Sequence, residues 1–99
     1  MAKKAQIQWL VLCGFKKPAS TDGALSAKVK ELIALAIGIV VHCAGCISFH
    51  IHDAIEAGAS REEIVDAISF AIMMGGGPAV VYGSQALEAL EQFETEGEC

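Results

Sequence analysis

Residues 42–53 have the sequence His-Cys-Ala-Gly-Cys-Ile-Ser-Phe-His-Ile-His-Asp. On an α-helix, with about 100° of rotation per residue, Cys43, Cys46 and His50 fall within a narrow arc of one face, and His52 falls on the opposite side. Cys46 and His50 are an i,i+4 pair, the spacing at which helical side chains touch. Two thiols with a base beside them are typical of redox chemistry. This stretch therefore predicts a helix that carries a reactive site.

The segments on either side of the central stretch also have helical signals. Ser26 is expected to be the N-cap of a helix that ends near Val41. In that helix an apolar stripe is expected to form the core face: Val29, Leu32, Ile33, Ala36, Ile37 and Val40. The helix that begins at about Cys43 is expected to end at Gly58, a natural C′ residue.

The second half of the chain predicts two further helices. Ser60-Arg61-Glu62-Glu63 has the spacing of a capping box and is expected to open a helix that ends at Gly75. The Gly-Gly-Gly-Pro stretch at 75–78 predicts a tight turn, and a last helix is expected from about Pro78 to Phe93. No segment alternates convincingly as a strand. The predicted fold class is all-α, a compact helical bundle.

Glu31 allows two interpretations. By periodicity alone it is an exposed residue near a helix start, where the helix dipole favours it. If the first two helices form an antiparallel hairpin with its turn near 41–42, Glu31 returns opposite residues 50–54. Its carboxylate then comes close to His50.

Composition points to assembly. Ninety-nine residues are enough for one domain, yet 54% of them are hydrophobic, which is more apolar material than one small core can hide. The charge-free run 32–49 is near the lower length limit for a spanning helix, but His42, Cys43 and small residues dilute it. A second apolar stretch, 64–82, is interrupted by Asp66 and the glycine turn. The sequence therefore favours a homo-oligomer without a membrane span.

Charge and the ends of the chain suggest the compartment. The net charge is −5 with a single Arg, so nucleic-acid binding has little electrostatic support. The N-terminus lacks a clean signal-peptide cleavage site, and we expect a cytoplasmic protein. Residues 1–21 are expected to form an arm or a short helix. Cys13 and Cys99 have no evident partner, and Cys13 is expected to be a small core residue.

Thiol chemistry follows from the central residues. A helix N-terminus, a Cys-x-x-Cys arrangement and a nearby His each favour the thiolate. His50 lies one turn from Cys46 and is placed to accept its proton, with Glu31 holding the imidazole. Attack on a peroxide gives a sulfenic acid, which Cys43 is placed to condense to a disulfide. An external thiol must then reduce the pair, and no cofactor is required.

Two other interpretations of the same residues stay open. One is a structural pair of buried cysteines with a satisfied core histidine. The other is a non-redox oligomeric binding module with a zinc site built from Cys43, Cys46 and His50, completed by Glu31 or by a residue of another subunit.

The sequence resembles the alkyl hydroperoxidase D-like (AhpD-like) branch of the carboxymuconolactone decarboxylase family over about residues 22–93. The motifs that carry the resemblance are Asp-Gly-Ala-Leu-Ser at 22–26, Lys-Glu-Leu-Ile-Ala-Leu-Ala at 30–36, Cys43-x-x-Cys46-x-x-x-His50, Asp53-x-x-x-Ala57-Gly58-Ala59-Ser60-x-x-Glu63-Ile64 and Met74-Gly75-Gly76-Gly77-Pro78. Glu31, twelve positions before Cys43, matches the family's catalytic glutamate. By this resemblance we expect a single short repeat without the additional N-terminal helical region of the longer hydroperoxidases.

The resemblance implies a single all-helical domain over 1–99 that assembles as a trimer or a ring-shaped hexamer. It implies thiol-dependent peroxidase or disulfide reductase chemistry, with a hydroperoxide or disulfide substrate and an external thiol reductant. Cys46 would attack, Cys43 would resolve, and Glu31 and His50 would relay the proton. The namesake decarboxylases lack this Cys pair, which disfavours decarboxylation of a small carboxylated lactone but leaves it as a third interpretation.

Overall fold

The computed structural model describes residues 7–8, 11, 14 and 18–96, and the prediction of an all-α fold is confirmed within them. Four helices build the bundle: α2 (Ala27–Val40), α3 (Ala44–Glu56), α4 (Arg61–Gly75) and α5 (Gly77–Glu96). The first three match the expected segments closely. The last begins one residue before Pro78 and continues three residues beyond Phe93. In the described part of the chain no segment forms a strand.

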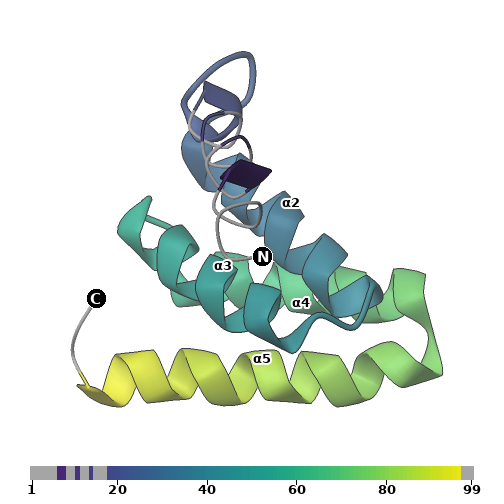
Figure 1. The fold of residues 1–99 in the computed structure, drawn as a ribbon. Helices are drawn as coiled ribbons and strands as arrows, with labels where there is room; N and C mark the ends of the chain where they lie inside the picture. The colour runs from purple at the N-terminus through teal and green to yellow at the C-terminus, as the bar shows by residue number, and fades with distance from the viewer. Residues whose placement is uncertain (1–6, 9–10, 12–13, 15–17, 97–99) are drawn as a thin grey trace.

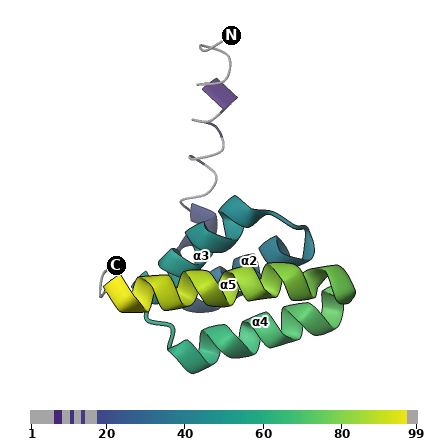
Figure 2. The same ribbon diagram turned by 90° about the horizontal axis from the view of Figure 1, so that it is seen from below.

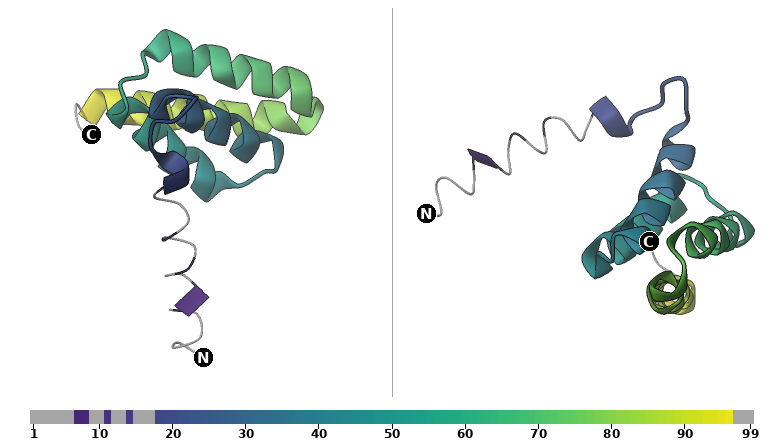
Figure 3. Two further views of the ribbon diagram at one scale, coloured as in Figure 1. Left: turned by 90° about the horizontal axis from the view of Figure 1, so that it is seen from above. Right: turned by 90° about the vertical axis from the view of Figure 1, so that its right-hand side faces the viewer.

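Each of the four helices packs against at least two of the others. Helix α3 doubles back along α2, and α5 lies across the face of α3 (Figure 1). Helices α4 and α5 lie side by side and antiparallel in Figure 2, and the right-hand view of Figure 3 shows them nearly end-on. Helix α2 contacts all three of the others. This arrangement brings α2 and α3, which carry the candidate site residues, into direct contact.

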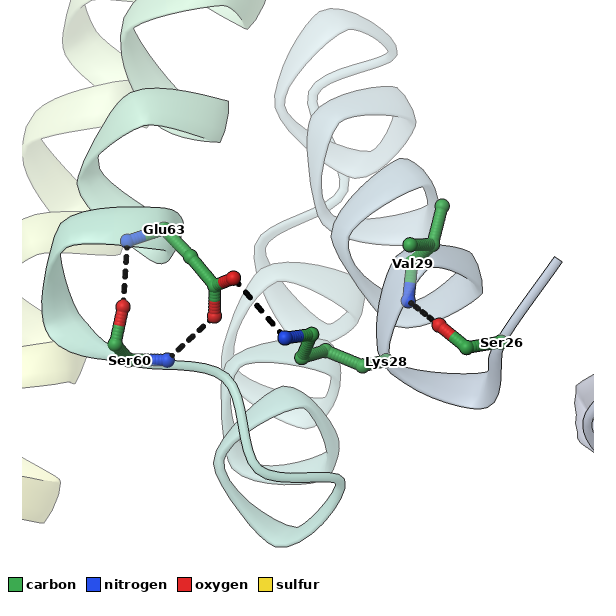
Figure 4. Close-up of polar contacts among 5 residues, drawn as sticks. All are labelled: Ser26, Lys28, Val29, Ser60 and Glu63. Carbon is green, nitrogen blue, oxygen red and sulfur yellow. Dashed lines mark hydrogen bonds and ion pairs between the residues drawn. The ribbon is translucent and has the colours of Figure 1, made fainter.

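Side-chain caps fix where α2 and α4 begin (Figure 4). The Val29 N–H donates to Ser26 Oγ at 3.2 Å. At the start of α4 the Glu63 N–H donates to Ser60 Oγ at 3.1 Å, while the Ser60 N–H donates to Glu63 Oε1 at 2.9 Å. The predicted capping box is therefore present. Lys28 Nζ donates to Glu63 Oε2 at 3.0 Å, which ties α2 to this cap.

Glycines allow the chain to reverse after α3 and after α4. Gly58 has φ 96°, and the Ala59 N–H donates to the carbonyl of Ala54, as expected of a C′ glycine. Gly76 has φ 74° between α4 and α5. Within α5, a Cβ on Gly83 would lie 2.7 Å from Ile72 Cδ1. The absence of a side chain there lets α5 approach α4 closely.

The core face of α2 differs from the one that the sequence predicts. Leu35 and Ile39 of α2 are fully buried, in a core with Ile47, Ile51, Ile64, Ile68 and Leu90. By contrast, four members of the expected stripe are exposed: Val29, Ile33, Ile37 and Val40. The prediction was wrong for these four because α2 is apolar around almost its whole circumference after Glu31. Periodicity alone therefore does not show which face is buried.

Several sequence predictions concern parts of the chain on which the structure says little. Cys13 and Cys99 lie outside the described residues, as does most of the expected N-terminal arm. Within the arm, Ile7 and Val11 are exposed. Among the described helices, none has both the length and the apolar character that crossing a bilayer requires.

Candidate redox site

The turn between α2 and α3 positions the first cysteine. Helix α2 ends with His42 in the left-handed region at φ 64°. The Cys43 N–H donates to the Gly38 carbonyl at 2.9 Å and the His42 N–H to the Ile39 carbonyl at 3.3 Å. These two bonds form a Schellman motif, which usually has glycine where His42 lies. The His42 ring stacks on Tyr82 of α5, with ring centroids 4.6 Å apart and planes inclined by 6°.

Cys43 is the N-cap of α3, and its sulfur accepts the Cys46 N–H at 3.3 Å. The structure joins Cys43 and Cys46 in a disulfide, with their Cα atoms 5.2 Å apart. Both residues are half-buried. The pair therefore occupies the first turn of α3, where the helix dipole and free backbone N–H groups favour a negatively charged sulfur once the disulfide is reduced.

Gly38 lets α2 approach this turn. A Cβ added at Gly38 would lie 3.2 Å from Cys46 Cβ and 3.7 Å from the Ile47 nitrogen. Any larger residue at this position would contact the backbone of the disulfide turn. The absence of a side chain at Gly38 therefore allows α2 to pack closely against the turn that carries the cysteine pair.

Glu31 and His50 form a hydrogen bond across the α2–α3 interface. The distance from Glu31 Oε1 to His50 Nδ1 is 2.7 Å. The Glu31 side chain is only 10% exposed and that of His50 is 21% exposed. When the Glu31 carboxylate is ionised it can only accept, so His50 then donates from Nδ1–H, and in the neutral ring Nε2 keeps a free lone pair. The contact between the two residues is the one that the hairpin interpretation predicts.

The other histidine of α3 faces a different neighbour. The His52 ring lies 5.6 Å from the Phe93 ring of α5, and its Nδ1 is 3.4 Å from Asp53 Oδ1. His52 therefore contacts Phe93 of α5, whereas His50 contacts Glu31 of α2.

Asp53 extends the group of site residues and was missed by the sequence reasoning. One ligand atom from each of Glu31, His50 and Asp53 lies within 4.8 Å of the others. A signal was present in the sequence, because Cys46, His50 and Asp53 follow an i, i+4, i+7 pattern on one helix face. Two other residues carried no such signal: Gly38, and His42 with its left-handed backbone.

A polar groove runs beside the cysteine pair, between α3 and α5. Its volume is about 440 Å³, and its lining residues are Ala44, Ile47, Ser48, Gln85, Glu88, Ala89 and Gln92. Ala44 directly follows Cys43, so the groove adjoins the first turn of α3. A larger depression of about 580 Å³ is lined by residues between Arg61 and Ser69 of α4. It shares no residue with the cysteine turn, and we assign it no part in the site.

Residues 10–89 match the carboxymuconolactone decarboxylase family. An uncharacterised protein of Cupriavidus necator is 43% identical over 75% of this chain and 66% of its own length. A protein of Paracoccus denitrificans, described only as uncharacterised protein 4 in the cox locus, is 37% identical over 79% of this chain and 70% of its own length. The chain thus covers about two-thirds of these relatives, just under that share in the Cupriavidus protein.

Two solved structures share the fold. A carboxymuconolactone decarboxylase family protein from Legionella pneumophila is 41% identical, with a TM-score of 0.78 over 93% of this chain and 85% of that one. A family protein from Thermotoga maritima, for which an involvement in the antioxidative response has been suggested, is 27% identical, with a TM-score of 0.85 over 92% and 94% of the two chains. The chain belongs to the carboxymuconolactone decarboxylase family.

Proposed function

We propose that the protein is a thiol-dependent peroxidase or disulfide oxidoreductase with an antioxidant role. The observation that carries the proposal is the cysteine pair at the N-terminus of α3, with His50 one turn further along that helix and hydrogen-bonded to Glu31 of α2. The suggested involvement of the Thermotoga relative in the antioxidative response agrees with it. Membership of the carboxymuconolactone decarboxylase family, taken alone, supports an enzyme but does not point to one particular reaction.

The proposed cycle begins with the reduced pair. The Cys46 thiol gives its proton to Nε2 of His50, whose Nδ1–H is held by Glu31. The thiolate attacks the outer oxygen of a hydroperoxide, the O–O bond breaks, and the alkoxide takes a proton to leave as an alcohol. Cys46 is now a sulfenic acid.

The second half of the cycle closes the disulfide. The Cys43 sulfur attacks the Cys46 sulfur, an S–S bond forms, and the hydroxyl leaves as water. The disulfide in the structure corresponds to this product. An external dithiol then supplies two electrons and two protons by thiol–disulfide exchange and becomes a disulfide itself. The groove beside Ala44 is the proposed place where the substrate or reductant approaches.

We also propose that the protein acts as a homo-oligomer, a trimer or a hexamer. The exposed stripe of α2 continues into an apolar groove of about 280 Å³ lined by Ala36, Ile37, Val40, Phe70, Ala71 and Met74. Large contiguous apolar patches on a small chain mark interaction surfaces. A second copy of the chain is the proposed partner, with no nucleic acid and no membrane involved.

Single-cysteine variants test the redox proposal. In a peroxide-consumption assay with a dithiol reductant, Cys46→Ser should lose turnover, whereas Cys99→Ser should keep it. Cys43→Ser should still react once with peroxide and leave a sulfenic acid at Cys46 that dimedone labels. Full turnover by Cys46→Ser would refute the assignment, and dimedone labelling of Cys43 in that variant would reverse the two cysteine roles.

A further inference from the structure

We propose that Glu31, His50 and Asp53 form a binding site for a divalent transition-metal ion such as Zn²⁺, which accepts imidazole and carboxylate ligands. Glu31 comes from α2, whereas His50 and Asp53 lie one turn apart on α3. Their ligand atoms lie within 4.8 Å of one another. This set differs from a zinc site built on the two cysteines, because it needs neither thiolate.

The donor chemistry matches such an ion. Zinc in proteins accepts imidazole nitrogen and carboxylate oxygen at about 2.0–2.2 Å, and three protein ligands with one open position are common. Ligand atoms around a tetrahedral ion are then about 3.4 Å apart. The contact between Glu31 Oε1 and His50 Nδ1, at 2.7 Å, needs to open by less than about 1 Å.

The burial of these donor groups also favours a cation. Glu31 is buried, and its carboxyl group is hydrogen-bonded to the imidazole of His50. Two carboxyl groups and an imidazole, one carboxyl of them buried, are the kind of donors that a divalent ion accepts in a half-buried place. His50 and Asp53 are half-buried, so the site is open to solvent on the α3 side.

An ion at this site would block the proposed proton transfer. A metal bound at His50 Nδ1 moves the ring hydrogen to Nε2, because a neutral imidazole carries only one. Nε2 then no longer accepts the proton of Cys46. Zinc would therefore act as an inhibitor of the thiol reaction, and this consequence, unlike binding itself, rests on the proposed function.

Calorimetry on the disulfide form tests binding without thiolate ligands. The Cys43–Cys46 disulfide is kept intact, Cys13 and Cys99 are alkylated, and Zn²⁺ is titrated in a buffer that does not bind metal. We expect saturation at one ion per chain. Asp53→Asn and Glu31→Gln should each weaken binding at least about tenfold. Asp66→Asn is the matched control, since it removes an exposed carboxylate on α4 that is not part of this group, and it should bind as the parent chain does.

Three results would overturn the proposal: no saturable binding, unchanged binding in a folded Asp53→Asn or Glu31→Gln variant, or an equal loss in Asp66→Asn. Circular dichroism establishes which variants are folded, and the two ligand variants provide independent tests. Zinc binding in a protein that does not turn over peroxide would refute the proposed function but not the metal site. Peroxide turnover by a protein that does not bind zinc would refute the metal site but not the proposed function.

Discussion

Glu31 Oε1 lies 2.7 Å from His50 Nδ1, although nineteen positions separate the two residues in the chain. The bond joins α2 to α3 one turn beyond Cys46, and it fixes which ring nitrogen of His50 carries the hydrogen. A buried carboxylate and an imidazole are therefore placed together beside the cysteine pair. This relationship, more than the cysteines alone, connects the fold with the proposed chemistry.

Removing His50 should slow the proposed reaction strongly. General acid–base groups contribute about 100-fold to 10,000-fold to rates, so His50→Ala should reduce peroxide turnover by at least about 100-fold. Alkylation of Cys46 in this variant should also require a higher pH. Glu31→Gln should have a smaller effect than Glu31→Ala, because an amide oxygen can still accept the Nδ1–H. An unchanged pH profile of alkylation in His50→Ala would exclude His50 from the proton transfer.

The start of α4 should make stability depend on pH. The Ser60 N–H, and then Lys28, donate to Glu63 and hold the pKa of its carboxyl below 4.5. A lowered folded-state pKa means that this stabilisation is complete above 4.5 and is lost as the pH falls through the lower folded-state value. Glu63→Gln should therefore unfold at lower urea than the parent chain at pH 7, with the difference shrinking in acid. A difference that stayed constant with pH would contradict this reading of Glu63.

Ser60 provides a comparison at the same cap. Ser60→Ala removes the hydroxyl that accepts the Glu63 N–H, and loss of such a cap costs about 1 kcal/mol. Urea unfolding at pH 7 should show a loss of this order. No loss would mean that the cap contributes little to the stability of the bundle.

Two helical glycines should respond differently to alanine. Gly45 has open space around it, so Gly45→Ala should stabilise the protein by up to about 1 kcal/mol through helix propensity. Gly38→Ala places a methyl group 3.2 Å from Cys46 Cβ, which is carried on backbone and cannot rotate away. We expect Gly38→Ala to be less stable than Gly45→Ala and to change the reduction potential of the cysteine pair. Equal stability and potential in both variants would contradict the close approach of α2.

A charge in the exposed stripe of α2 should disrupt the proposed oligomer. Ile37 is 56% exposed and lines the apolar groove, so Ile37→Lys should weaken association with little effect on the folding of one chain. Ser48→Lys, on the polar groove, is the control. Light scattering at micromolar concentration should give a trimer or hexamer for the parent chain and a smaller species for Ile37→Lys. A monomeric parent chain would refute the assembly.

Much of the fold follows from local signals in the sequence. The caps at Ser26 and Ser60 and the C′ glycine at Gly58 lie where their residue types predict. The assumption of an antiparallel hairpin between the first two helices was enough to predict the contact between Glu31 and His50. Each of these features depends on the spacing of nearby residues or on one tight turn, and both can be recognised in the sequence.

Other features depend on packing between helices and could not be obtained in this way. The side of α2 that is buried is the side that packs against α3 and α4. The sequence of α2 does not identify it, because α2 is apolar on several sides. The left-handed His42 depends on a Schellman turn and on stacking with Tyr82, forty positions away. Gly38 has a role only because Cys46 lies against it. These residues show how the site depends on contacts between helices.

The most direct test of the central claim is the intact mass of the reduced, metal-free protein before and after one equivalent of an organic hydroperoxide, followed by peptide mapping. The account predicts a loss of two hydrogens that maps to a Cys43–Cys46 disulfide. An unchanged mass, or oxidation confined to other residues, would contradict it.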